Sequence, residues 1–344
     1  MPVHGEKMLA YSAEQRLGMG KTMRRREFIA LFGTSVAWPF AAMAQEPGRT
    51  YRVGGLSSGP RNAPVHVAMF DVLRRLGFIE GQNLTIVWHA YALQVDLIPE
   101  FAAELVKSKV DVIYASGDAV RVAQQATATI PILGVTRDMV GQGLVNSLAR
   151  PGGNITGVSV LATELDGKRL EILIEAMPGL RRMAILADTK ATRSQDLEAL
   201  QNAARARGIE VSIHRVANGE EITETIDTAK ASGAAALNVL SAPVLYGNRQ
   251  VIIDRVAALR LPAIYPWAEE AEEGGFLAYG PRIIQIFREL VAEQLVKLLR
   301  GVKPADIPVE QPTKFELVIN LKTAKAMGVT VPEALLVRAD KVIE

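Results

Sequence analysis

The sequence predicts an α/β fold of two lobes, each built on a doubly wound parallel sheet. Short apolar segments typical of strands alternate with helical segments, and the first four strands are spaced about 20–30 residues apart. The alternation stops near 143–160 and then starts again with the same plan. A repeated plan in a chain of 344 residues indicates two lobes with a cleft between them.

The first run opens with an apolar strand, a polar loop and an amphipathic helix that ends at Gly77. Three further strands follow, each preceded by a helix or a turn. The predicted strands are 51–56, 84–89, 110–115 and 130–135, and the predicted helices are 63–76, 97–107 and 118–127.

The stretch 143–160 belongs to neither run. It begins as a helix end over 144–149, turns at 150–154 and continues as a short β-branched segment over 155–160. Pro151 cannot continue a helix, so the chain changes direction here. We interpret the stretch as a crossing between lobes; the alternative is a surface turn within one large domain.

The second run repeats the alternation. Its predicted strands are 182–187, 210–216, 234–240, 263–265, 275–279 and 315–319, and its helices are 165–176, 194–207, 220–232, 248–259 and 281–299. The last two strands flank the long helix, so the chain can return to the first lobe and leave it again. Three crossing segments are therefore expected, with the first lobe formed by 45–158 plus about 280–310 and the second by 159–279 plus about 311–344.

Residues 1–44 have the pattern of an export signal. Arg24, Arg25 and Arg26 precede an apolar run over 28–42, and Ala42-Met43-Ala44 fits a cleavage site. The run is too short and too broken to span a bilayer. Arg25-Arg26-x-Phe28-Ile29 fits the twin-arginine pattern, with an ordinary secretory signal as the alternative. Translation starts at Met1 or at Met23.

Composition indicates an ordinary globular protein, with 49% hydrophobic and 22% charged residues. Residues 1–44 hold six of the 39 basic residues and three of the 37 acidic ones, so the remainder is nearly neutral. Near-neutrality gives no electrostatic reason to expect nucleic acid as a partner. With no cysteine, the chain has neither a disulfide nor an N-terminal cysteine for a lipid anchor, and we expect it to be free in the periplasm.

Gly55-Leu56-Ser57-Ser58-Gly59 matches the G-x-S-x-G pattern of serine hydrolases, between a strand and a helix. The hydrolase order requires a histidine late in the chain, and the last histidine is His214. We therefore favour Ser57 as a ligand-binding serine over Ser57 as a nucleophile. No metal-ligand spacing and no dinucleotide or nucleotide motif occurs, so we expect no metal, no cofactor and no catalytic residue.

Polar and aromatic residues lie at the carboxyl ends of the predicted strands, where open α/β sheets bind ligands. Each also has an alternative explanation as a turn or helix-cap residue. Arg137 and Thr189 lie at the same strand ends. The residues expected to bind ligand are Ser57, Ser58, Ser116, Gly117, Asp118, Thr136, Asp138, Asp188, Ser241, Tyr265, Trp267 and Glu269.

Several segments resemble one family, the exported substrate-binding proteins of ABC transporters that include tryptophan- and tyrosine-binding members. The resemblance covers about 51–344. Its most specific segments are 81–84 (GQNL), 147–157 (SLARPGGNITG), 167–171 (GKRLE), 261–265 (LPAIY) and 310–324 (EQPTKFELVINLKTA).

This resemblance implies a type I periplasmic-binding fold that closes on a small solute by hinge motion and delivers it to an inner-membrane permease. It places the hinge at Gly157, Tyr279 and Gly280, near the crossings, and implies no cofactor. Many members have Gly-Gly-Thr-Pro and Gly-Asp-Pro-Val where this chain has Ser116-Gly117-Asp118-Ala119 and Arg137-Asp138-Met139-Val140. The ligand therefore need not be an aromatic amino acid. A hydrolase using Ser57 and a periplasmic sensor lobe are the alternative functions.

Overall fold

The computed structural model describes residues 48–92 and 94–344, which belong to one compact unit. The export signal predicted over 1–44 lies outside these residues. Within them, no helix is both long enough and apolar enough to cross a membrane.

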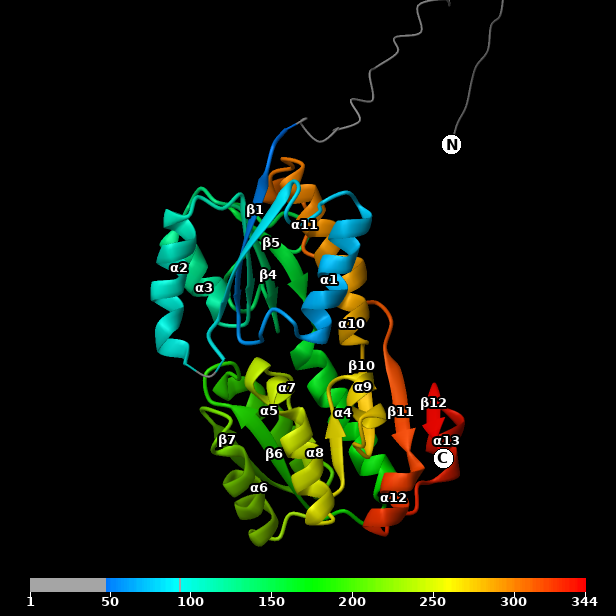
Figure 1. Ribbon diagram of the computed structural model, residues 1–344. Coiled ribbons are helices and arrows are strands. Elements are labelled where there is room, and N and C mark those ends of the chain that lie inside the picture. Colours follow the sequence, from blue (N-terminus) through cyan, green and yellow to red (C-terminus); the bar gives the residue numbers. More distant parts are fainter. Residues whose placement is uncertain (1–47, 93) are drawn as a thin grey trace, which may run out of the picture. The chain divides into compact units, whose positions relative to one another are not determined.

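The first sheet has five parallel strands in the order β2-β1-β3-β4-β5 (Figure 1). All four strands predicted in the first run are present. The strands are β1 (Tyr51–Ser57), β2 (Leu84–Ala90), β3 (Val112–Ser116), β4 (Ile132–Thr136) and β5 (Ile155–Ser159); the helices are α1 (Pro64–Arg75), η1 (Val95–Leu97), α2 (Ile98–Lys107) and α3 (Ala119–Ala126).

Helices cover both faces of this sheet. On one face, α1 and a late helix, α11 (Ala292–Leu299), pack against the sheet around Met69, Tyr114 and Leu295. On the other face, α2 and α3 pack around Leu105 and Ile113. Alternate residues of the buried strands point to opposite faces, so one strand sequence contributes to both cores.

The second sheet has seven strands in the order β12-β11-β10-β9-β8-β6-β7. Its strands are β6 (Arg182–Asp188), β7 (Glu210–Val216), β8 (Leu237–Val239), β9 (Ala263–Tyr265), β10 (Leu277–Gly280), β11 (Glu316–Asn320) and β12 (Lys341–Ile343). Its helices are α4 (Ala162–Ala176), α5 (Ser194–Arg205), α6 (Ile222–Ala231), α7 (Pro243–Gly247), α8 (Arg249–Ala258), α9 (Ala268–Glu272), α12 (Leu321–Met327) and α13 (Glu333–Val337).

This sheet is also doubly wound. The helices α6 and α8 pack on one face around Ile226 and Val256, whereas α4 and α5 pack on the other around Leu173 and Leu200. The two-lobed α/β class predicted from the sequence is confirmed. The sequence reading did not include β12, a strand of three residues at the sheet edge.

One strand pair of the second sheet departs from the parallel pattern. Strand β11 runs antiparallel to β10, whereas the other pairs of this sheet are parallel. The direction reverses because the chain leaves the second sheet at the end of β10 and returns along β11, as Figure 1 shows.

Three segments connect the sheets. The first follows β5 and enters α4 through Leu161, whose φ is +55°. The second follows β10 and enters a continuous helical stretch, α10 (Ile283–Gln285), the π-helical η2 (Ile286–Val291) and α11. The third follows η3 (Pro304–Asp306) and passes Glu310, which pairs with Val158 of β5 before the chain reaches β11.

Two expectations for 143–160 are wrong. Residues 144–149 form turns rather than a helix end, because Gly143 takes a φ of +64° and the Leu144 amide bonds back to Met139. The seven residues between Gly143 and Pro151 are also too few to form a stable helix. The segment 155–159 does not lie outside both sheets, because it pairs with β4 as the edge strand of the first. The first crossing therefore begins after Ser159.

Candidate functional site

A cavity of ≈ 620 Å³ lies where the carboxyl ends of strands from the two sheets meet. The first sheet contributes loops after β1, β3 and β4, and the second contributes loops after β6, β8 and β9. The crossing stretch adds Ile283, Ile286 and Phe287. Loops of both sheets therefore surround the same volume, which is in the usual range for small-molecule sites.

Eight of the residues predicted to bind ligand line this cavity. They are Ser57, Ser58, Ser116, Gly117, Asp118, Thr136, Ser241 and Trp267.

The other four predicted residues do not line it. Asp138 accepts a hydrogen bond from the Gly141 amide at 2.8 Å and lies 3.6 Å from Arg193. Asp188 accepts from two backbone amides of the turn after β6. Tyr265 is fully buried in the core of the second sheet, and Glu269 accepts from the first amides of α10.

Two aromatic groups, largely absent from the sequence prediction, form much of the cavity wall. His66, Tyr114 and Phe287 contact one another edge-on on the first-sheet side, with centroids 5.7–6.1 Å apart. Tyr246 and Trp267 meet edge-on at 6.3 Å on the second-sheet side. Only Trp267 was predicted. Helical or strand periodicity explains the other aromatic residues as core positions, so the sequence held no separate signal for them.

His66 links the aromatic wall to the serine loop. Its Nδ1 lies 2.8 Å from the Pro60 carbonyl oxygen and its Nε2 lies 3.4 Å from Ser57 Oγ. The first contact requires Nδ1 to donate, which leaves Nε2 as the acceptor from the serine hydroxyl. Burial lowers the pKa of His66, so the ring is neutral near pH 7.

In the described part of the chain, His66 Nδ1 bonds to the Pro60 carbonyl and to no carboxylate of the kind that orients the histidine of a serine hydrolase. Ser57 is only 2% exposed, and its hydroxyl also lies 3.2 Å from that of Ser116. The arrangement is a buried polar network that positions the loop after β1. It provides no geometric support for a nucleophile.

Arg137 joins the two sheets beside the cavity. Arg137 follows β4 and donates hydrogen bonds to the Ser241 carbonyl, which follows β8, and to the carboxylate of Asp166 in α4. The distance between Arg137 and Asp166 is 2.7 Å. Asp166 also accepts from Arg169, which in turn donates to the Tyr279 carbonyl. All three charged side chains are at most 7% exposed, so this ion network is buried.

Glu270 is a second buried ionisable group, behind Trp267. It is 1% exposed and accepts a hydrogen bond from the Trp267 amide at 3.0 Å. The pKa of Glu270 is raised to about 8, mainly by burial and in part by the nearby charge of Glu273, while the hydrogen bond from Trp267 opposes the rise. The carboxyl group is therefore largely protonated at neutral pH.

Glu270→Gln is expected to change the pH dependence of stability. The pKa of Glu270 is higher in the folded protein than in the unfolded chain, so protonation of Glu270 favours the folded state. Its contribution to the free energy of unfolding is fully present below about pH 4.5 and is lost as pH rises through about 8. Glutamine keeps the oxygen that accepts from Trp267 but cannot ionise. We expect the variant to match wild type at pH 4–5 and to exceed it above pH 8 by on the order of 3 kcal/mol. Melting temperatures across pH test this, with exposed Glu224→Gln as the control; parallel curves for wild type and Glu270→Gln would contradict it.

Among the described residues, no group of three or more His, Cys, Asp and Glu side chains is placed to hold a metal ion.

The sequence model of the family described as ABC transporter substrate binding protein matches residues 60–343. This chain belongs to that family. It is a family of substrate-binding proteins rather than enzymes. The resemblance inferred from the sequence is confirmed.

Similar proteins agree with this assignment. The "Tyrosine-binding protein" of Clostridioides difficile (strain R20291) is 27% identical over 256 residues, 73% of this chain and 72% of that protein. A conserved domain protein from Vibrio cholerae has a similar solved structure, with a TM-score of 0.76, 23% identity and coverage of 86% of this chain and 99% of that one. An ABC domain in complex with L-Trp from Streptococcus pneumoniae gives a TM-score of 0.75, 23% identity and coverage of 86% and 100%.

Proposed function

We propose that this substrate-binding protein serves an ABC importer. It captures a small solute, an amino acid or a related small organic molecule, between its lobes and presents the closed form to an inner-membrane permease. The lobes are those expected from the sequence, 45–158 with about 280–310 and 159–279 with about 311–344. The export signal over 1–44 would bring the chain to the periplasm.

The observation that carries this proposal is the shared cavity. Loops after β1, β3 and β4 face loops after β6, β8 and β9 across ≈ 620 Å³. A ligand that contacts both sets favours the closed arrangement over an open one, and only such differential contact shifts the equilibrium.

The wall favours a ligand with an apolar body. Aromatic rings from both sheets, His66, Tyr114, Phe287, Tyr246 and Trp267, line the cavity. Hydroxyl groups and Asp118 lie at the strand ends beside them. This combination suits an amino acid with an apolar or aromatic side chain, in keeping with the tyrosine and tryptophan named for two similar proteins.

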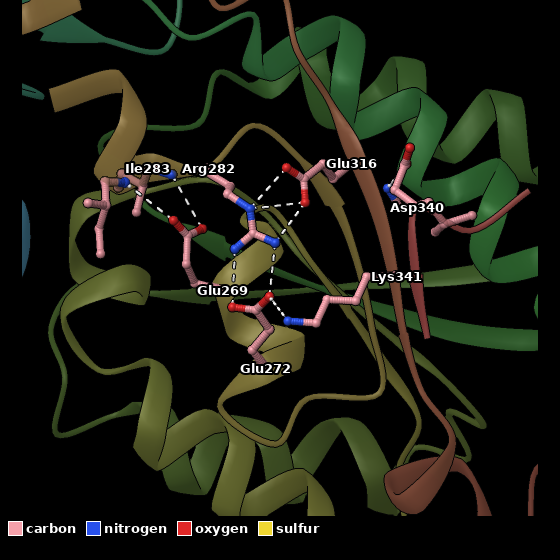
Figure 2. A network of polar contacts seen from close by, with 9 residues as sticks. Glu269, Glu272, Arg282, Ile283, Glu316, Asp340 and Lys341 are labelled. Atoms are coloured by element: carbon pink, nitrogen blue, oxygen red, sulfur yellow. Dashed lines mark hydrogen bonds and ion pairs between the residues drawn. The ribbon is translucent and has the colours of Figure 1, made fainter. Parts of the chain in front are cut away.

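Closure of the lobes requires the crossing segments to move together. One ion network links two of these segments. The Arg282 guanidinium, at the start of the second crossing, contacts Glu272 at 2.9 Å and Glu316 at 2.7 Å (Figure 2). Glu316 is the first residue of β11, at the end of the third crossing. Glu269 holds the first amides of α10, as Figure 2 also shows. The second and third crossings are therefore tied at the second sheet, and we place the hinge at these segments, near Tyr279 and Gly280. Gly157, the other expected hinge residue, lies inside β5 and pairs with Gly134, so we place the bend of the first crossing after Ser159.

Arg282→Gln is expected to lower stability by about 1–2 kcal/mol, because a partly buried arginine loses two carboxylate partners. Arg338→Gln is the matched control, since Arg338 also contacts one glutamate but both side chains are exposed. We expect a smaller effect there. Thermal melts of both variants measure this, and equal shifts would contradict the role given to the Arg282 network.

A thermal-shift screen tests the proposed function. The purified protein is mixed with amino acids, their decarboxylated amines, small carboxylic acids and purines. A ligand at about 100 times its dissociation constant adds roughly 2.7 kcal/mol to the free energy of unfolding, which raises the melting temperature by several degrees. We expect a saturable shift with amino acids that have apolar side chains. No shift with any compound, in protein freed of retained ligand by unfolding and refolding, would contradict the proposal.

A further inference from the structure

The cavity wall contains two arginines, and both are already paired. Arg249 donates to Glu273 at 2.6 and 3.0 Å and to the Tyr246 carbonyl. Arg137 donates to Asp166 and to the Ser241 carbonyl. Neither guanidinium is left as a free cation for a ligand carboxylate.

Asp118, the aspartate of the cavity wall, is not paired in this way with any of the described residues. Asp118 precedes α3 but makes no cap hydrogen bond, and none of the described residues donates a hydrogen bond or ion pair to its side chain. Asp188, the last residue of β6 and not part of the cavity wall, has a carboxylate occupied by two amides of the turn that follows, and the nearby Lys190 is exposed. Burial raises the pKa of Asp118, the charge of Asp188 raises it further, and Lys190 lowers it. The carboxylate of Asp118 therefore has no close cationic partner among the described residues. A cationic group of a ligand would supply one.

Four other polar atoms of the wall, including Tyr114 OH and Gln142 Oε1, have no hydrogen-bond partner among the described residues, and two of them bear on the ligand. These two are Thr136 Oγ1 and the indole Nε1 of Trp267, on side chains only 3% and 6% exposed. Because an indole N–H only donates, its partner must be an acceptor. Buried groups left unpaired cost free energy, so an occupant that pairs with them gains affinity.

We propose that Asp118 binds a cationic amino group of the ligand and that this amino group, rather than a carboxylate, is the feature that the site requires. The substrate class is an organic amine with an apolar body, including but not limited to α-amino acids. This inference rests on the proposed function, because it takes the cavity as the ligand site.

Three probes with one indole body and different charge test the proposal: L-tryptophan, tryptamine, which lacks the carboxylate, and 3-indolepropionate, which lacks the amine. Binding to the wild-type protein is measured by calorimetry. We expect tryptamine to bind within about tenfold of L-tryptophan and 3-indolepropionate to bind about 10- to 100-fold more weakly, the range for loss of a charge-assisted hydrogen bond.

Asp118→Asn removes the charge at nearly constant volume and is expected to weaken both amines about 10- to 100-fold while leaving 3-indolepropionate unweakened. Asp138→Asn is the matched control, because Asp138 follows the neighbouring strand but contacts Gly141 and Arg193 outside the cavity wall. We expect wild-type affinities there.

The possible failures are distinguishable. If 3-indolepropionate binds as tightly as tryptamine, or if Asp118→Asn leaves amine binding unchanged, then Asp118 does not bind the amino group as proposed. The proposed receptor function stands in that case. If no compound of the broader thermal-shift panel binds the wild-type protein, the proposed function fails, and the proposed role of Asp118 fails with it.

Discussion

Asp166→Ala is expected to destabilise the protein by about 3–5 kcal/mol, the usual cost of removing one partner of a buried ion pair. Asp166 accepts from both Arg137 and Arg169, so its loss leaves two buried guanidinium groups without their shared carboxylate. Arg137 comes from the first sheet and Asp166 from α4, which packs on the second. The variant should therefore also loosen the contact between the sheets at the cavity.

Differential scanning calorimetry measures this effect. Asp196→Ala is the control, since Asp196 forms an ion pair of similar length with Arg193, at 2.9 Å, but Arg193 is one-third exposed. We expect a loss of about 1 kcal/mol there. A shift for Asp166→Ala no larger than for Asp196→Ala would mean that the buried network contributes nothing beyond an ion pair whose arginine is partly exposed.

The second large effect is expected for Gly157→Ala. Gly157 has a φ of +144°, and a Cβ atom there would lie 1.8 Å from the Gly134 carbonyl oxygen of the neighbouring strand. Backbone atoms of paired strands cannot move apart without breaking the ladder between β4 and β5. We expect more than about 4 kcal/mol of destabilisation, or no soluble protein.

Gly167→Ala is the matched control for this substitution. Gly167 lies within α4 with open space around the position of a Cβ atom. Alanine there is expected to stabilise the helix by about 0.5–1 kcal/mol. The two variants are compared by soluble yield and thermal melting. A wild-type melting temperature for Gly157→Ala would contradict the close backbone contact.

Local sequence patterns predicted the strands well because this fold buries them on both faces. A continuous apolar run such as 112–115, flanked by helical segments, is typical of a strand buried on both faces. The edge strand β12 was not predicted, because three residues with partly exposed side chains carry too little pattern. The failure over 144–149 has a different cause, since glycines on one side and proline on the other favour turns over a helix of so few residues.

Strand ends predicted the position of the site but not all of its chemistry. Serine, threonine and aspartate at strand ends commonly either stabilise a turn or bind a ligand, and the sequence does not distinguish these two roles. Asp118 lines the cavity with no hydrogen bond or ion pair from the described residues, whereas the carboxylate of Asp188 accepts from an amide of its own turn. The pairing of Arg137 with Asp166 depends on the packing of the second lobe against the first. Long-range contacts of this kind leave no local pattern in the chain.

One measurement tests the central claim, that the cavity between the two sheets is the ligand site. Calorimetric titration of L-tryptophan, or of the best compound from the screen, is compared for wild type, Ser58→Trp and Ser232→Trp. Ser58 lines the cavity, and Ser232 is exposed at the end of α6. We expect one site per chain in wild type and in Ser232→Trp, and at least a tenfold loss of affinity when the indole of Ser58→Trp fills the cavity. Unchanged affinity in Ser58→Trp would place the ligand elsewhere and contradict the account.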